Sequence, residues 1–274
     1  MATLAGSGFA RPHESDNLSG TARAHSIDRW IFVGMAVWFI LIVLVGFVPD
    51  SMMKAAIVKA GARAPFPAIL HVHAMLMGSF LLLLLAQTVM VATERGALHQ
   101  QVGIAAFVLV PALVIVGLIL APTMFHQAWG GAHFGPPAVR KALTPVVPIL
   151  ENILLLQIRA GVLFAVFIGI ALRARATAPG MHKRMMFLAT AVPLGAALDR
   201  MWWLPSTMPA SPWATDVYIL LAISPMFVWD LVRNRRVHEA YKVWLAIYLP
   251  AAALVTFAWD KPWWHSAAER VMGV

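Results

Sequence analysis

The sequence contains no cysteine and few charged residues. Of its 274 residues, 12% are charged, against about 25% in soluble domains. Without cysteine the chain can form no disulfide, no iron–sulfur cluster and no thiolate-ligated haem, and it has no thiol nucleophile. Histidine, aspartate, glutamate and methionine are the side chains left that could bind a metal ion or a cofactor.

Apolar sequence, by contrast, is abundant. Hydrophobic residues make up 61% of the chain, and the mean hydropathy is +0.77. Several segments exceed the ~18 mainly apolar residues that a membrane-spanning helix requires. The chain is therefore predicted to be an all-α integral membrane protein embedded in the lipid bilayer. The net charge of +9 lies in short loops between apolar segments, where it directs topology and does not indicate nucleic-acid binding.

The apolar segments predict a lone first span followed by three helical hairpins. The seven expected spans are residues 30–48, 66–92, 100–124, 148–172, 182–204, 212–232 and 238–259. Residues 1–27 are polar and have no apolar core of signal-peptide type, so a cytosolic tail is expected there. The transmembrane domain then covers residues 28–260, and residues 261–274 form a periplasmic tail.

Lysine and arginine are distributed unevenly between the two sides of this arrangement. With the N-terminus inside, twelve fall on the cytosolic side and seven on the outer side, while Arg159 and Arg200 lie within spans. Because cytosolic loops carry an excess of basic residues, the N-terminus is expected in the cytosol. The chain is predicted to be a multi-pass protein of the bacterial inner (cytoplasmic) membrane.

Polar side chains gather toward the outer ends of the predicted spans. The candidate metal ligands among them are His71, His73, His126, His133, Glu151 and Asp199. Imidazole and carboxylate groups bind zinc, and imidazole also binds copper, so this set is a possible metal site. The alternative is that the histidines only anchor helix ends, since side chains two apart on a regular helix diverge by about 200°.

Arg159 is the deepest charge in the predicted spans. An ionisable residue within a span costs roughly 2.5–3.5 kcal/mol on insertion scales and normally pairs or lines a cavity. Glu151 and Asp199 are the expected partners of Arg159, and Asp199 with Arg200 is a second candidate pair. Such pairs can also fix helix register without any chemistry.

Each predicted cytosolic turn carries a histidine near the start of the next outward helix. The turns read "ATERGALHQQVG", "RARATAPGMHKRMM" and "RNRRVHEAYKV", and the histidines are His99, His182 and His238. His99 and His182 lie on parallel helices and could face each other across a haem iron. Arg95, Lys183 and Arg184 would then lie near the haem propionates. The alternative is a neutral histidine that is hydrogen-bonded to its own turn.

The stretches "TERGALHQQVG" and "HKRMMFLATAVPLGAALDR" resemble paired His-Arg/Lys-Arg turns in a family of uncharacterised bacterial polytopic membrane proteins. More distantly, the pattern is similar to the ascorbate-reducible diheme transmembrane b-type cytochromes, in which four histidines on four consecutive helices bind two haems. That resemblance implies His99 and His182 as one axial pair and His73 as a ligand of the second haem. The span 148–172 has no histidine to complete the second pair.

Three functions are compatible with these patterns. The first is a haem b- or metal-binding redox protein that exchanges electrons with a quinone or another lipophilic partner. The second is a non-catalytic accessory or assembly subunit of a larger membrane complex. The third is a zinc-dependent membrane hydrolase, with His71, His73, Glu151 and Asp199 around a metal-activated water. In the absence of haem, zinc or copper is the expected cofactor.

Overall fold

The computed structural model describes residues 26–61 and 63–274, and this part of the chain is helical with no strands. The predicted cytosolic tail lies outside the described residues except for Ser26 and Ile27, which begin the first helix. The elements are α1 (Ser26–Lys59), α2 (Ala68–Ala92), α3 (Gly96–Gly103), α4 (Ala106–Phe134), α5 (Pro137–Leu143), η1 (Thr144–Val146), α6 (Val147–Ala174), α7 (Pro179–Ala191), η2 (Val192–Leu194), α8 (Gly195–Leu198), α9 (Trp213–Asn234), α10 (Glu239–Ala258) and α11 (Pro262–Met272).

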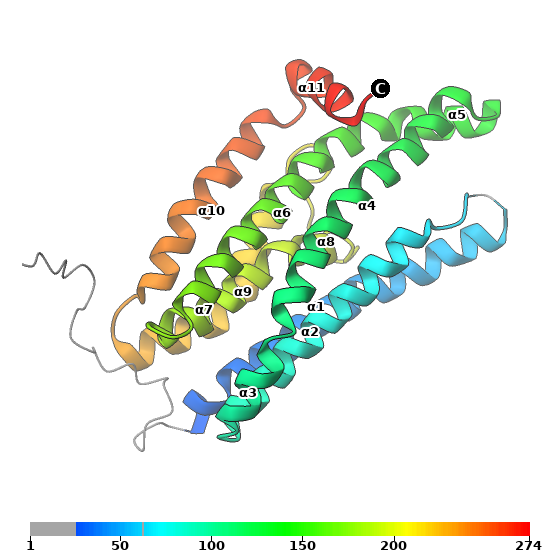
Figure 1. Ribbon diagram of the computed structural model, residues 1–274. Coiled ribbons are helices and arrows are strands. Elements are labelled where there is room, and N and C mark those ends of the chain that lie inside the picture. The colour runs from blue at the N-terminus through cyan, green and yellow to red at the C-terminus, as the bar shows by residue number, and fades with distance from the viewer. Residues whose placement is uncertain (1–25, 62) are drawn as a thin grey trace, which may run out of the picture.

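Six helical stretches of the described chain are long and apolar enough to cross a membrane. They are Ser26–Lys59, Ala68–Ala92, Gly96–Phe134, Pro137–Ala174, Trp213–Asn234 and Glu239–Ala258. Figure 1 shows them as one tilted helical bundle. The fold is therefore that of a polytopic helical membrane protein, as the composition predicts.

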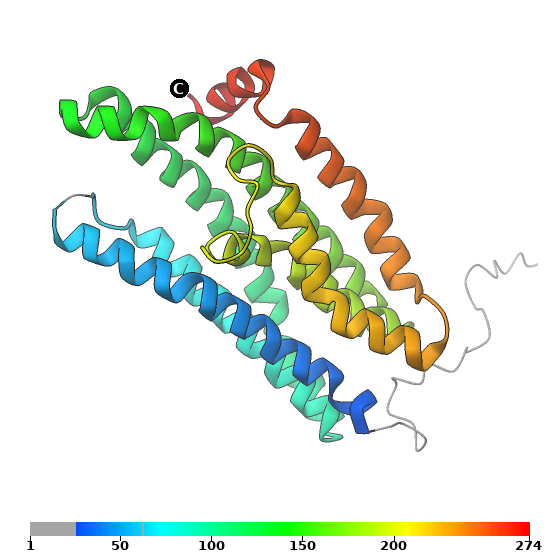
Figure 2. The same ribbon diagram turned by 180° about the vertical axis from the view of Figure 1, so that it is seen from behind.

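The fifth predicted span, residues 182–204, differs from the other six. α7 is only 13 residues long, η2 follows it at Pro193, and α8 ends at Leu198. Proline lacks the N–H that would continue the α-helical hydrogen bonds, which explains the change to a 3-10 turn. Residues 199–212 are non-helical and lead to α9, as the yellow segment in Figure 2 shows.

α7 is an internal helix of the bundle. It packs along α6 and also contacts α10, α9 and α1. Its side chains Phe187 and Leu188 are buried, and the indole of Trp244 on α10 donates a hydrogen bond to the Leu188 carbonyl at 2.9 Å. α7 is buried against protein, so it needs less apolar sequence than a lipid-facing helix of the same length.

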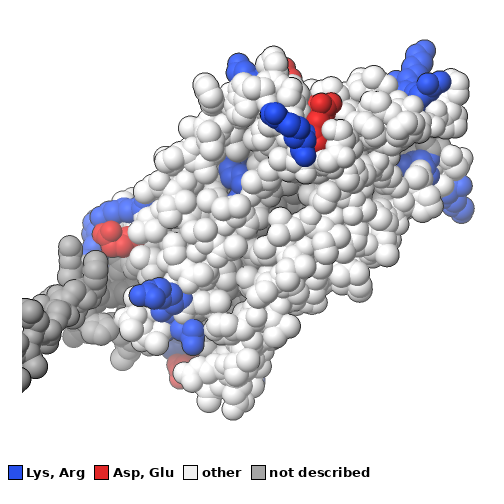
Figure 3. Space-filling view, turned by 45° about the horizontal axis from the view of Figure 1, so that its top comes forward, with Lys and Arg blue, Asp and Glu red and all other residues white. Residues whose placement is uncertain are grey.

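The two ends of the bundle differ in charge and in structure. We call the start of α1 with the turns 93–95, 175–178 and 235–238 the basic end, because arginines cluster there. The far end carries the turn 60–67, α5 and α11 (Figure 1). On the face shown in Figure 3, most of the surface between the ends is free of charged side chains, as contact with lipid tails requires.

Candidate functional site at the basic end

His182 lies in the first turn of α7, and it connects that helix to α6. Its Nδ1 is 2.8 Å from the carbonyl oxygen of Ala171. A carbonyl only accepts hydrogen bonds, so Nδ1 carries the proton and donates. In the neutral ring, Nε2 is then the unprotonated nitrogen, and no described residue hydrogen-bonds to it. This nitrogen is free to bind a metal.

His99 also contacts the helix that precedes it through Nδ1, but with a different partner. Its Nδ1 is 3.4 Å from the backbone oxygen of Gln87 in α2 and accepts a hydrogen bond from the side-chain N–H of the same residue at 2.5 Å. The partner carbonyl lies 12 residues before His99, and the corresponding interval for His182 is 11 residues. His238 differs, because it caps α10 and its Nδ1 accepts from the backbone N–H of Ala240 at 3.1 Å.

His99 and His182 lie near each other at the basic end. Each interacts electrostatically with the other, and Arg175 also acts on His182. Both imidazole rings are half-buried. His99 and His182 thus lie close together on separate helices, each with Nδ1 toward the preceding helix.

An apolar groove runs between α4 and α6 beside these histidines. Its volume is about 340 Å³, within the range of small-ligand pockets, and its wall includes Phe107, Val110, Ile168, Gly169 and Leu172. Leu172 directly follows the residue whose carbonyl accepts the hydrogen bond from His182. The groove therefore begins one residue from the carbonyl that anchors His182.

The arginines predicted near the haem propionates are placed differently from each other. Arg184 is fully buried, forms an ion pair with Asp230 and donates to the carbonyl of Gly180 at 3.0 Å. It is therefore not available for a propionate, which corrects the expectation from sequence. Arg95 is exposed in the turn before α3 and remains available.

The predicted outer metal set is not assembled at one place. No group of three or more His, Asp or Glu side chains that could hold a metal ion is found among residues 26–61 and 63–274. His126 lies 2.6 Å from a carbonyl of α11, and His133 bonds at 2.9 Å to a carbonyl one turn earlier in α4. The Nδ1 of His73 is buried without a partner in the described chain.

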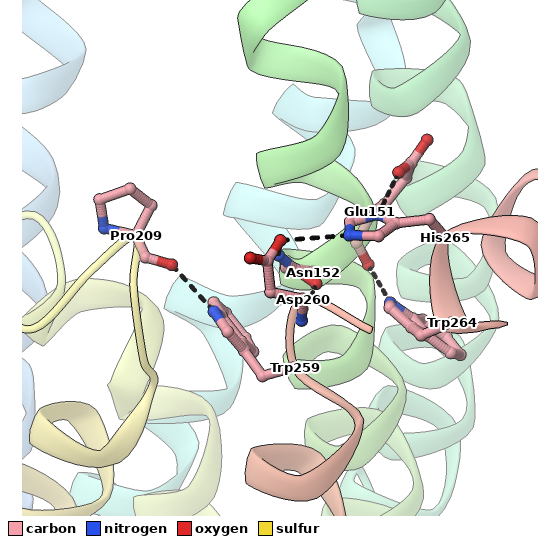
Figure 4. A network of polar contacts seen from close by, with 7 residues as sticks. All are labelled: Glu151, Asn152, Pro209, Trp259, Asp260, Trp264 and His265. Carbon is pink, nitrogen blue, oxygen red and sulfur yellow. Dashed lines mark hydrogen bonds and ion pairs between the residues drawn. The ribbon is translucent and has the colours of Figure 1, made fainter. Parts of the chain in front are cut away.

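Glu151 binds the C-terminal helix instead of a metal (Figure 4). Its carboxylate is 2.5 Å from Nδ1 of His265, and its backbone oxygen accepts a hydrogen bond from the Trp264 indole at 2.9 Å. The neighbouring Asn152 accepts from the backbone N–H of Asp260 at 3.0 Å. Residues 261–274, predicted as a tail, thus include α11, which docks on α6.

Arg159 is buried and paired, but with a residue that the sequence did not single out. Its guanidinium lies 2.6 Å from Asp216 at the start of α9, and the hydroxyl of Tyr248 donates to the same carboxylate at 2.6 Å. The expected partners lie elsewhere: Asp199 accepts from Thr215, and Glu151 binds α11. Asp216, like Arg159, is a charged residue within a predicted span. A search for charged residues within the spans would therefore have identified both.

Arg200 is also paired with a carboxylate other than the one expected. Its Nε is 3.3 Å from Asp50 of α1, so the structure does not join Arg200 and Asp199 as a pair.

Comparison with known proteins identifies no relative. No family model matches the chain, and no curated protein or solved structure is significantly similar to it.

Proposed function

We propose that this chain is a multi-pass protein of the bacterial inner membrane that binds haem b between His99 and His182 and transfers electrons. In this proposal the N-terminus and the basic end face the cytosol, and α7 to α8 counts as a seventh, internal span. Six long apolar helices support the membrane location. The cofactor and the reaction rest on the geometry of the two histidines.

The observation that carries the proposal is that both rings are held at Nδ1 by the preceding helix and lie close together. Histidines that ligate metals almost always donate their other ring N–H to a carboxylate, a backbone carbonyl or water. Nδ1 of His182 bonds to Ala171, and Nδ1 of His99 faces the backbone oxygen of Gln87. Each ring is thereby oriented before any ligand binds, and its Nε2 has no described partner.

The protein residues would hold and insulate the cofactor. Bound haem supplies one-electron redox chemistry. His99 and His182 would be its axial ligands, the wall of the α4–α6 groove would exclude water beside it, and Arg95 would neutralise a propionate. A membrane-soluble quinone is a suitable partner, because it reaches the protein through the lipid.

The test is an absorption spectrum of the purified full chain, oxidised and then reduced with dithionite, with metal analysis on the same sample. We expect a Soret band and sharpened bands on reduction. His99→Ala and His182→Ala should each remove most of the absorbance. His99→Gln and His182→Gln, which retain a side-chain N–H donor, should remove it without loss of thermal stability.

His238→Ala is the matched control, since His238 also begins a helix at the basic end but uses its Nδ1 as a cap. It should leave the spectrum unchanged. A colourless wild-type protein reconstituted with haem, or equal absorbance in all variants, would contradict the proposal. Stoichiometric zinc without colour would instead favour the hydrolase.

A second candidate is an accessory subunit that packs against a larger membrane complex. α2 and the α3–α4 stretch are the spans least covered by the rest of the protein. Of the 18 most apolar consecutive residues in each span, 17% are buried in these two and 33% in the other four. Their uncovered faces could bind another subunit as well as lipid. Co-purification of a stoichiometric partner, lost when bulky residues are introduced on α2, would support this function.

A further inference from the structure

We propose that the groove between α4 and α6 binds one acyl chain of an anionic phospholipid whose phosphate is held by Arg175. This inference goes beyond electron transfer and does not depend on haem binding. It rests on the apolar wall of the groove and on the position of one arginine at its mouth.

The groove has the apolar lining that an acyl chain requires. Its wall consists of apolar residues of α4 and α6, including Pro111, Val114 and Ala165. Gly169 forms part of the wall on α6, and a Cβ added there would meet no atom within 4 Å. The absence of a side chain at this position therefore leaves open space in the groove.

Arg175 marks the mouth of the groove at the basic end. Its guanidinium lies 5.2 Å from the centroid of the Phe107 ring, and its Nη1 donates to the Leu172 carbonyl at 3.1 Å. Phe107 and Leu172 both line the groove, so these contacts fix the guanidinium directly beside the cavity. The remaining N–H groups of Arg175 have no hydrogen-bond partner among the described residues.

The charge around this mouth favours an anionic headgroup. A guanidinium binds phosphate through two parallel hydrogen bonds, and basic pockets between membrane helices on the cytosolic side bind anionic lipids. Arg173 is exposed two residues before Arg175, and His182 lies nearby. Glu94, an acidic residue in the turn before α3 at the same end of the bundle, is paired with Arg29 at 2.9 Å.

The test is native mass spectrometry of the detergent-solubilised full chain titrated with phosphatidylglycerol or with phosphatidylcholine of the same acyl chains. We expect the first phosphatidylglycerol to bind at least about tenfold more tightly than phosphatidylcholine. Arg175→Gln should reduce that preference to about twofold, because it removes the charge that recognises phosphate. Gly169→Leu should weaken binding of both lipids, because it fills the groove.

Two control variants separate this site from general effects. Arg140→Gln removes a charge at the far end, and Val166→Leu changes a lipid-exposed side chain of α6 outside the groove. Both should bind like the wild type, and the thermal stability of all variants should match. Equal affinity for the two lipids in the wild type, or an equal loss in Arg140→Gln and Arg175→Gln, would overturn the proposal.

Discussion

At the scale of single residues, the most demanding feature is the buried charge of Arg159. The guanidinium is satisfied by Asp216 at two of its nitrogens, while the Tyr248 ring lies 5.3 Å from its carbon. Tyr248 in turn stacks on Trp244 with the ring centroids 4.3 Å apart. The ion pair thus lies against the Tyr248 ring, which Trp244 supports from behind.

We expect Asp216→Ala to destabilise the protein by about 3–5 kcal/mol, because it leaves the Arg159 charge buried without a partner. Tyr248→Phe should cost about 1.5–3 kcal/mol through the loss of one hydrogen bond to a charged group. Unfolding of the purified protein in mixed micelles, followed by circular dichroism, measures both. Replacing both charges, in Arg159→Met with Asp216→Leu, should recover most of the stability.

The matched control is Glu94→Gln, which breaks the exposed ion pair with Arg29. Exposed ion pairs contribute about 0–1 kcal/mol, so this substitution should leave the free energy of unfolding nearly unchanged. If Asp216→Ala also left the free energy of unfolding unchanged, Arg159 would have to be hydrated inside the bundle.

The sequence predicted a paired Arg159 but not its partner. A charge in an apolar span must be compensated, so the need for a carboxylate follows from the solvent alone. Which helix supplies that carboxylate depends on the packing of α6 against α9 and α10, and no local pattern encodes it. The same limit applies to the outer histidines. They lie near helix ends in the sequence, but this does not determine which of them lie close together in the folded chain.

At the scale of elements, α1 and α8 approach each other closely at Gly46. A Cβ at Gly46 would lie 2.2 Å from the carbonyl oxygen of Ala197. A backbone atom cannot yield as a flexible side chain can, so only glycine permits this approach. The break after Leu198 therefore lies directly against α1.

Gly46→Ala should destabilise the protein by about 1–3 kcal/mol, because the added methyl group pushes α8 away from α1. Gly34→Ala is the control in the same helix, since a Cβ at Gly34 meets nothing within 4 Å. It should be neutral or slightly stabilising, because alanine favours the helix. Thermal unfolding of both variants checks the difference, and equal midpoints would contradict the close contact.

The long apolar helices were predictable from the sequence, because a helix that crosses the hydrocarbon core of a bilayer needs a long run of apolar residues. The fifth segment was not predicted correctly in its outer half. Pro193 is visible in the sequence, yet proline also occurs inside the helices α4, α9 and α10, which continue through it. The helix ends after Leu198 within a tightly packed interior, and this packing is a property of the tertiary fold.

At the scale of the whole molecule, the basic end and the far end define an orientation. By the positive-inside rule we expect the basic end to face the cytosol. The chain has no cysteine, so a single introduced thiol can be labelled without background.

In intact cells, a membrane-impermeant maleimide should label Lys141→Cys at the far end and leave Glu94→Cys at the basic end unlabelled. Permeabilised cells should show labelling of both variants. The reverse pattern in intact cells would mean that the basic end faces outward.

The buried pair of Arg184 and Asp230 has a consequence for the order of events during synthesis. The two residues are 46 positions apart, so α7 leaves the ribosome well before Asp230 is synthesised. At about 5–20 residues per second, the delay is roughly 2–9 s. During that interval α7 must stay against α6 or the insertion machinery, and it reaches its final place only when α9 arrives. A nascent chain that stops before Asp230 would therefore lack this buried ion pair and should be a preferred substrate for membrane quality-control proteases.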